Sequence, residues 1–101
     1  MKVSHNYYVY ITTNKNKTVL YTGVTNNLRA RIQTHKENAT FYTPKTFTGK
    51  YNAYHLIFYE HYNDIKHAIL REKEIKGWRR SKKIDLINSF NKEWKFLEEE
   101  G

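Results

Sequence analysis

The sequence predicts an α+β fold in a single domain, residues 1–101, with a small three-stranded antiparallel sheet flanked by about three helices. The chain has 101 residues, without an internal repeat or a linker-like stretch, which is the size of one domain with a modest core. Three short segments are rich in aromatic and β-branched residues, and three other segments are typical of helices. We expect the core to span about residues 6–97.

The first two strands are expected to form a hairpin, because "YYVYITT" (7–13) and "VLYTGV" (19–24) flank the turn signal "NKNK". If the turn centres on Lys15–Asn16, Tyr10 lies opposite Tyr21, and Tyr8 lies opposite Gly23. Side chains alternate along a strand, so these four residues share one face, and Gly23 leaves room over the phenols. The opposite, core-facing side of the hairpin carries Val9, Ile11 and Leu20.

A helix is expected to follow the hairpin directly. Residues 25–27 supply side chains that favour an N-cap. Leu28 and Ile32 then form an apolar edge, and Arg31 and His35 lie one helical turn apart beside it. These two polar side chains are either the solvent-facing side of an ordinary helix or groups directed at a substrate.

The rest of the chain is expected to hold one strand and two helices. Residues 37–55 are irregular and contain the only proline, so they predict a long loop of the kind that is often functional. The segment "LIFYEHY" (56–62) predicts the third strand, and residues 64 to about 78 and 81–90 predict helices. Trp94 and Leu97 are expected to fold back onto the core.

The charge distribution favours a polyphosphate partner. The formal net charge is +8 and the pI is about 9.7. Before Glu60, one acid, Glu37, is set against eight lysines and arginines. Basic residues interspersed with aromatic ones suit nucleic acid, although a solvated basic surface is an alternative. The candidate contacts to a nucleic-acid backbone are Arg29, Lys36, Lys45, Lys50, Arg79, Arg80, Lys82 and Lys83.

The composition also excludes several classes of protein. The chain contains no cysteine, so a disulfide-linked partner and a thiolate metal site are not expected. No apolar run approaches the roughly 18 residues that a membrane span needs, and the N-terminus lacks the apolar stretch of a signal peptide. We therefore expect an intracellular, cytoplasmic protein.

One carboxylate in the second predicted helix stands in an unusual place. At about 100° per residue, an apolar stripe forms from Ile65, Ala68, Ile69 and Ile75, and Glu72 falls inside it. Glu74 points the opposite way. A carboxylate on an apolar face is costly unless it is paired or binds a metal. Periodicity alone leaves open a functional role, a buried pairing with an arginine, and a position at the edge of the stripe from which the carboxylate reaches solvent.

Five blocks of sequence, in order, resemble the GIY-YIG endonuclease superfamily. These blocks are "YVY" at 8–10, "YTG" at 21–23, "GVTNNLRARIQTH" at 23–35, "TFTGKYNAYHLIFYE" at 46–60 and "AILREKEIKGWRRSKK" at 68–83. The chain looks most like the small stand-alone members related to the nuclease domain of the excinuclease C subunit. A lone YxG would carry little weight, but five blocks in order form a specific pattern.

The resemblance implies a set of site residues. Tyr10 and Tyr21 match the two motif tyrosines, Arg31 matches the family's arginine, and His35 occupies a position held by histidine or tyrosine. Glu72 matches the ligand of one divalent cation, Mg²⁺ or Mn²⁺. The implied activity is hydrolysis of phosphodiester bonds in DNA, including branched or damaged DNA, in repair or recombination.

The sequence departs from the family pattern in three places. Tyr8 replaces the glycine of the first motif, and Val24 stands where excinuclease-type domains carry a lysine. Some members have an asparagine after the metal-binding helix. Spacing puts Ile84 at that position, and Asn88 follows one turn later.

The implied mechanism uses a phenol to orient or deprotonate water and an arginine to bind phosphate oxygens. We favour Tyr10 as the general base, with Tyr21 orienting and His35 able to relay a proton, although the resemblance does not settle which tyrosine acts. The alternatives are a nucleic-acid-binding module with weak or absent cleavage and, with least support, a protein-interaction domain. The oligomeric state and the substrate preference stay open.

Overall fold

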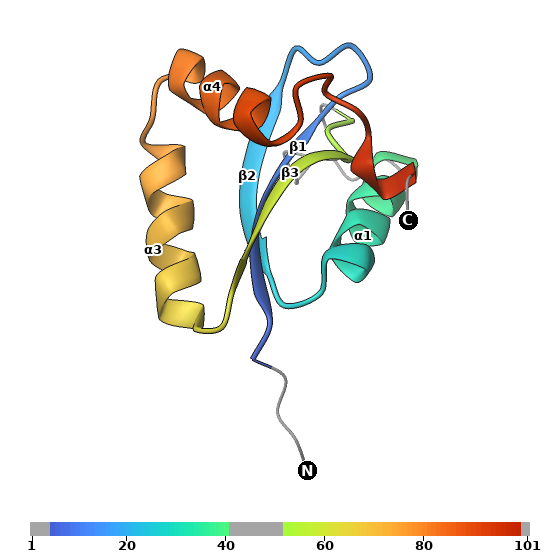
Figure 1. The fold of residues 1–101 in the computed structure, drawn as a ribbon. Coiled ribbons are helices and arrows are strands. Elements are labelled where there is room, and N and C mark those ends of the chain that lie inside the picture. The colour runs from blue at the N-terminus through green and yellow to red at the C-terminus, as the bar shows by residue number, and fades with distance from the viewer. Residues whose placement is uncertain (1–4, 41–51, 100–101) are drawn as a thin grey trace.

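The computed structural model describes residues 5–40 and 52–99, which form the predicted small antiparallel sheet with helices on both faces (Figure 1). The sheet has three strands, as predicted, and three α-helices flank it. The elements are β1 (Tyr7–Thr13), β2 (Leu20–Thr25), α1 (Leu28–Thr40), β3 (His55–Tyr62), α3 (Ile65–Lys76), α4 (Arg80–Phe90) and the 3₁₀ helix η1 (Leu97–Glu99).

Strand β1 lies in the middle of the sheet, because the strand order is β2-β1-β3 and both pairings are antiparallel. Residues 9–13 have no exposed surface at all. Figure 1 shows α3 on one side of the sheet and α1 on the other. A strand covered on both faces must be apolar or hydrogen-bonded on both, which explains the aromatic and β-branched composition of this segment.

Two apolar clusters hold the layers together. One cluster joins the sheet to α3 and α4 and contains Val9, Ile11, Ile57, Phe58, Ala68, Ile75 and Ile87. The other joins the sheet to α1 and contains Tyr10, Ile32 and Leu56, with Tyr21, Leu28 and Leu97 packed against it. The predicted division of the hairpin into a core face and a phenolic face is therefore confirmed. The phenolic face is itself covered by a helix.

The register of the hairpin differs from the predicted one by two residues. Tyr10 pairs with Gly23, and Tyr21 pairs with Thr12, whereas the turn signal predicted Tyr10 opposite Tyr21. Because side chains alternate with a period of two, a shift of two residues returns each side chain to its original face. Tyr8, Tyr10, Tyr21 and Gly23 therefore still share one face.

The hairpin loop explains the shift. It runs over residues 14–19 and is therefore longer than the predicted turn around Lys15–Asn16. The side-chain oxygen of Asn14 accepts hydrogen bonds from the backbone N–H groups of Thr18 and Val19, at 2.8 and 3.1 Å. Lys17 adopts a positive φ of 59° and donates its N–H to the Asn14 carbonyl. A side chain that bridges the loop in this way leaves no periodic signal in the sequence.

Helix α1 begins where the sequence predicts and ends later. The Asn27 side chain accepts a hydrogen bond from the Ala30 N–H at 3.1 Å, which is the expected N-cap. The helix continues to Thr40, so residues 37–40 are helical and the prediction of a loop from residue 37 was wrong there. Lys45 and Lys50, with most of that predicted loop, lie outside the described residues.

The C-terminal segment folds back onto the sheet as predicted. Trp94 packs against the first cluster and Leu97 against the second. The Asn91 side chain donates hydrogen bonds to the Ile57 and Lys95 carbonyls. Asn88 accepts a hydrogen bond from the Trp94 ring N–H at 2.6 Å, so this asparagine is engaged in holding the segment. Among the described helices, none has both the length and the apolar character to cross a membrane.

Gly23 allows the Tyr10 ring to lie directly against the backbone of β2. A Cβ atom built on Gly23 would lie 2.5 Å from Cζ and 2.9 Å from Cε1 of the Tyr10 ring, and closer still to the phenol oxygen. The prediction that Gly23 leaves room over the phenols is confirmed, and the room is filled by Tyr10.

We predict that Gly23→Ala lowers the free energy of unfolding by about 2–3 kcal/mol, because the added methyl group overpacks a buried ring. The matched control is Gly77→Ala. At Gly77 the backbone is right-handed helical with φ of −78°, and an added Cβ meets only backbone oxygens at 3.5 Å or more. Urea denaturation of both variants checks the prediction, and equal stability of the two would contradict it.

Candidate active site

Three aromatic side chains from three elements form the centre of the site. Tyr10 comes from β1, Tyr21 from β2 and His35 from α1. The ring centroids lie 6.3 Å apart for Tyr10 and Tyr21, 5.9 Å for Tyr10 and His35, and 5.5 Å for Tyr21 and His35. The tyrosines share a sheet face because of the hairpin register, and α1 places His35 over that face.

Tyr10 and His35 form a buried hydrogen-bonded pair. The phenol oxygen lies 2.9 Å from His35 Nε2, and the two residues have 0% and 5% of their surface exposed. The positive charge of the Arg31 guanidinium acts on the phenol and favours its ionised form. The phenol O–H donates to Nε2 in the tautomer that carries the imidazole proton on Nδ1.

Burial fixes the protonation of this pair. Burial lowers the pKa of His35 to about 4, and the nearby charge of Arg31 adds to the fall. Burial also raises the pKa of Tyr10 above its ordinary value, the neighbouring Tyr21 adds to the rise, and the charge of Arg31 opposes it. Both rings are therefore neutral at physiological pH.

The second predicted helix contributes Glu72. Its side chain is 15% exposed and lies at the margin of the apolar face of α3, which Ala68 and Ile75 form. The predicted stripe was too wide, because Ile65 and Ile69 are 39% and 37% exposed. The charge of Glu72 contributes to the rise in the pKa of the Tyr10 phenol, so the carboxylate lies close enough to the rings to act on them electrostatically.

Lys76 is a member of the cluster that the sequence prediction missed. Its Nζ lies 3.3 Å from Glu72 Oε1, one helical turn along α3, and 6.0 Å from the centre of the Tyr21 ring. The structural alternative for Glu72 was pairing with an arginine, but the partner is this lysine. The i, i+4 spacing of the two residues was the available signal.

The outward side of α3 is anchored separately. The Arg71 guanidinium donates to both carboxylate oxygens of Glu60, at 2.9 and 3.1 Å, and also to Glu74. Glu60 lies on β3, so this fork ties the helix to the sheet. Glu74 therefore has a structural role, whereas Glu72 on the same helix belongs to the candidate site.

The cluster offers one carboxylate to a metal. Among residues 5–40 and 52–99, no group of three or more histidine, aspartate or glutamate side chains is arranged to hold an ion. Mg²⁺ is often held by only one or two carboxylates, with water and substrate phosphates completing its shell. The half-buried Glu72 fits this mode of binding, in which substrate completes the site.

The predicted backbone contacts fall into two groups. Arg79, Arg80 and Lys82 are exposed and Lys83 is half-buried. They directly follow the end of α3 that carries Lys76. Lys82 Nζ lies 4.3 Å from the centre of the Trp78 ring. This group therefore continues from the candidate site along the chain.

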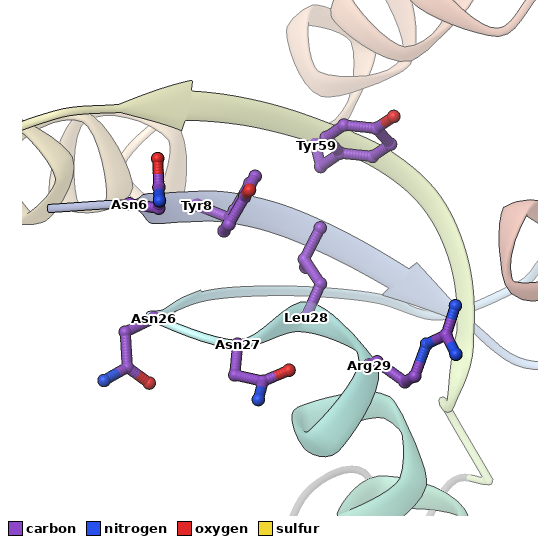
Figure 2. A pocket seen from close by; sticks show the side chains of 7 residues that line it. All are labelled: Asn6, Tyr8, Asn26, Asn27, Leu28, Arg29 and Tyr59. Carbon is purple, nitrogen blue, oxygen red and sulfur yellow. The ribbon is translucent and has the colours of Figure 1, made fainter. Parts of the chain in front are cut away.

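Arg29 and Lys36 lie elsewhere. Arg29 lines a depression of about 440 Å³ at the start of α1, between that helix and the sheet (Figure 2). Lys36 lines a neighbouring groove with Arg29, on the side of α1 that faces Leu56 and Leu97. None of the five predicted catalytic residues lines either hollow. The structure therefore separates these two cations from the ring cluster.

Residues 6–85 match the family described as the GIY-YIG catalytic domain. The chain belongs to the GIY-YIG family. The resemblance inferred from the five sequence blocks is confirmed, and GIY-YIG membership places the chain in a nuclease superfamily.

Other small proteins are similar to this GIY-YIG chain along most of their length. The UPF0213 protein CPE1444 of Clostridium perfringens is 35% identical over 82 residues, covering 81% of this chain and 83% of that protein. The UPF0213 protein SH2523 of Staphylococcus haemolyticus is 36% identical over 81 residues, covering 80% and 93%.

A solved structure supports the fold of this GIY-YIG chain. It is the solution NMR structure of the UPF0213 protein BH0048 from Bacillus halodurans, which matches with a TM-score of 0.56 and 25% identity. The match covers 91% of this chain and 93% of the other. The predicted fold class is therefore confirmed.

We predict that His35 makes stability depend on pH. Its folded-state pKa lies below the ordinary 6.5, so the stabilisation is fully present above pH 6.5 and is lost as the pH falls towards 4. The loss approaches about 3 kcal/mol at the acid end.

His35→Gln cannot titrate but can still accept a hydrogen bond from Tyr10. The difference in unfolding free energy between wild type and this variant should shrink between pH 7 and 5, measured by denaturant titration. A difference that stays constant over this interval would show that His35 is not held neutral by the fold.

Proposed function

We propose that this protein is a divalent-metal-dependent endonuclease that hydrolyses phosphodiester bonds in DNA, including branched or damaged DNA met in repair or recombination. One observation carries the proposal. Two phenols and an imidazole from three elements lie with their ring centroids 5.5 to 6.3 Å apart, and the charges of Arg31 and Glu72 both act on the Tyr10 phenol. Phosphodiester hydrolysis requires an oriented water, cations on the phosphate oxygens and stabilisation of the leaving oxygen.

Arg31 and Tyr21 are the residues proposed to touch the substrate. Arg31 is exposed and Tyr21 is half-buried, so both can be reached from solvent. The planar guanidinium suits two phosphate oxygens at once. The Tyr21 phenol orients the attacking water, and its deprotonated form accepts the proton that the water loses when its oxygen bonds to phosphorus.

Tyr10 and His35 are proposed to position these groups. Tyr10 has no exposed surface and burial raises its pKa, and both observations speak against our initial assignment of Tyr10 as the general base. The hydrogen bond between Tyr10 and His35 instead ties β1 to α1, the helix that carries Arg31. A buried, neutral imidazole suits this task better than proton relay, because its low pKa makes it a poor proton acceptor.

Glu72 is proposed to hold Mg²⁺ or Mn²⁺ together with the substrate phosphate. A divalent cation at this place would supply Lewis-acid stabilisation of the charge that develops on the phosphate. The carboxylate is half-buried and belongs to a cluster with an excess of positive charge from Arg31 and Lys76. This balance favours a polyanion in the site.

We predict that Glu72→Gln reduces cleavage of plasmid and branched DNA by at least about 100-fold in Mg²⁺ or Mn²⁺, because a neutral amide binds these cations weakly. The matched control is Glu74→Gln, which removes the same charge from the same helix two residues away. Gel assays of nicking and cleavage compare the two. Equal activity of wild type and Glu72→Gln would refute the mechanism.

We predict different consequences from removing each phenol oxygen. Tyr21→Phe should leave the unfolding free energy nearly unchanged and lower the cleavage rate about 100-fold or more, as expected for a lost acid-base group. Tyr10→Phe should destabilise the fold by about 1–2 kcal/mol, because it removes the buried hydrogen bond to His35 Nε2, and should reduce cleavage less. Single-turnover cleavage and urea denaturation measure both effects. If Tyr10→Phe lowers the cleavage rate more than Tyr21→Phe does, and Tyr21→Phe is the variant that destabilises the fold, the general base is Tyr10.

A nucleic-acid-binding module without cleavage is the second candidate, and the separate basic group at Arg79–Lys83 is the observation that favours it. It shares DNA binding with the first candidate. Wild-type protein that binds DNA but leaves it intact under all metal conditions would select this alternative.

A further inference from the structure

Lys76 occupies the place where the proposed metal ligand meets solvent. It is the last residue of α3, and its side chain is 51% exposed, whereas that of Glu72 is 15% exposed. The ammonium group lies 3.3 Å from Glu72 Oε1 and 6.0 Å from the centre of the Tyr21 ring. An attacking water and a phosphate oxygen would have to enter beside this ammonium group to reach the tyrosine and the carboxylate.

The ammonium group and a divalent cation compete for Glu72. The carboxylate can be neutralised by Lys76 in the free protein, as the 3.3 Å distance indicates. A cation placed on the same oxygens would repel the ammonium group at close range. The lysine stem has four rotatable carbons and reaches solvent, so the ammonium group can move without any change in the backbone.

We propose that Lys76 is a substrate-contacting residue: it pairs with Glu72 in the free protein and passes to a DNA phosphate oxygen when a divalent cation takes its place on the carboxylate. This inference rests on the proposed function, because it assumes that DNA enters the site. It assigns the site a second cation from another helix, because Arg31 belongs to α1 and Lys76 to α3.

An ordinary surface ion pair is the competing explanation. Lys–Glu pairs at i and i+4 contribute only about 0.3–0.5 kcal/mol to a helix, and a lysine in the last turn also interacts favourably with the helix dipole. Lys73 lies in the same last turn and is exposed. Lys73→Gln therefore removes the same charge with the same effect on the dipole, and it is the matched control for Lys76→Gln.

The first experiment measures DNA binding to the full chain by fluorescence anisotropy. The probe is a fluorescein-labelled flapped duplex, with Ca²⁺ replacing Mg²⁺ so that the DNA stays intact. Lys76→Gln should weaken binding about 5- to 10-fold and reduce the slope of log K against log salt by about 0.9, the value for one lost phosphate contact. Lys76→Arg should retain the slope, and Lys73→Gln should change it little.

The second experiment measures Mn²⁺ binding by calorimetry without DNA. Lys76→Gln should bind Mn²⁺ several-fold more tightly than wild type, because the competing ammonium group is gone, while Lys73→Gln should not. Thermal unfolding confirms that the variants remain folded. Identical behaviour of Lys76→Gln and Lys73→Gln in both experiments overturns the proposal.

The same data separate this inference from the endonuclease function. If the wild type binds the probe with a steep salt dependence but does not cleave DNA in Mg²⁺ or Mn²⁺, the endonuclease function fails, and the altered slope of Lys76→Gln still supports the phosphate contact. If the wild type cleaves DNA and the slopes of the two glutamine variants agree, the assignment of Lys76 fails alone. A wild type that does not bind the probe overturns both.

Discussion

The hydrogen bond between Tyr10 and His35 is the interaction on which the rest of the site depends. It joins the central strand β1 to helix α1 at a distance of 2.9 Å, inside an apolar layer. A buried phenol and a buried imidazole would each be costly alone, and each satisfies the other. The same contact sets the height of α1 above the sheet. It therefore decides where Arg31, one turn before His35, can reach.

The charged residues of helix α3 have two different roles. Arg71 donates two hydrogen bonds to Glu60 of β3. Its guanidinium also lies 5.1 Å from the centre of the Trp78 ring. The next residue, Glu72, pairs instead with Lys76, whose ammonium group lies 6.0 Å from the centre of the Tyr21 ring. A planar guanidinium fixes orientation better than a single charge does, so the Arg71–Glu60 ion pair fixes how α3 is rotated about its axis. That rotation also sets the position of the adjacent Glu72 carboxylate.

The sequence predicts the faces of the sheet better than its register. Alternation alone places Tyr10, Tyr21 and Gly23 on one side, but the pairing depends on how Asn14 bridges its loop, which no periodicity records. Glu72 was identified because helical spacing sets it against apolar residues. Its partner Lys76 was missed because a lysine at the end of a basic helix has many possible roles. Arg29 and Lys36 were grouped with the other cations by charge alone, and charge carries no information about which flank of a helix a residue occupies.

The close approach of Gly23 to Tyr10 has a consequence for how the chain can diverge. Any side chain at position 23 forces the Tyr10 ring to shift, since a Cβ there would lie 2.5 Å from ring carbon Cζ. The cost of a substitution at 23 therefore depends on the residue at 10, and the order of substitutions matters. A larger residue at 23 costs least after residue 10 has become smaller, which gives up the bond to His35. Selection that preserves Tyr10 therefore also preserves Gly23.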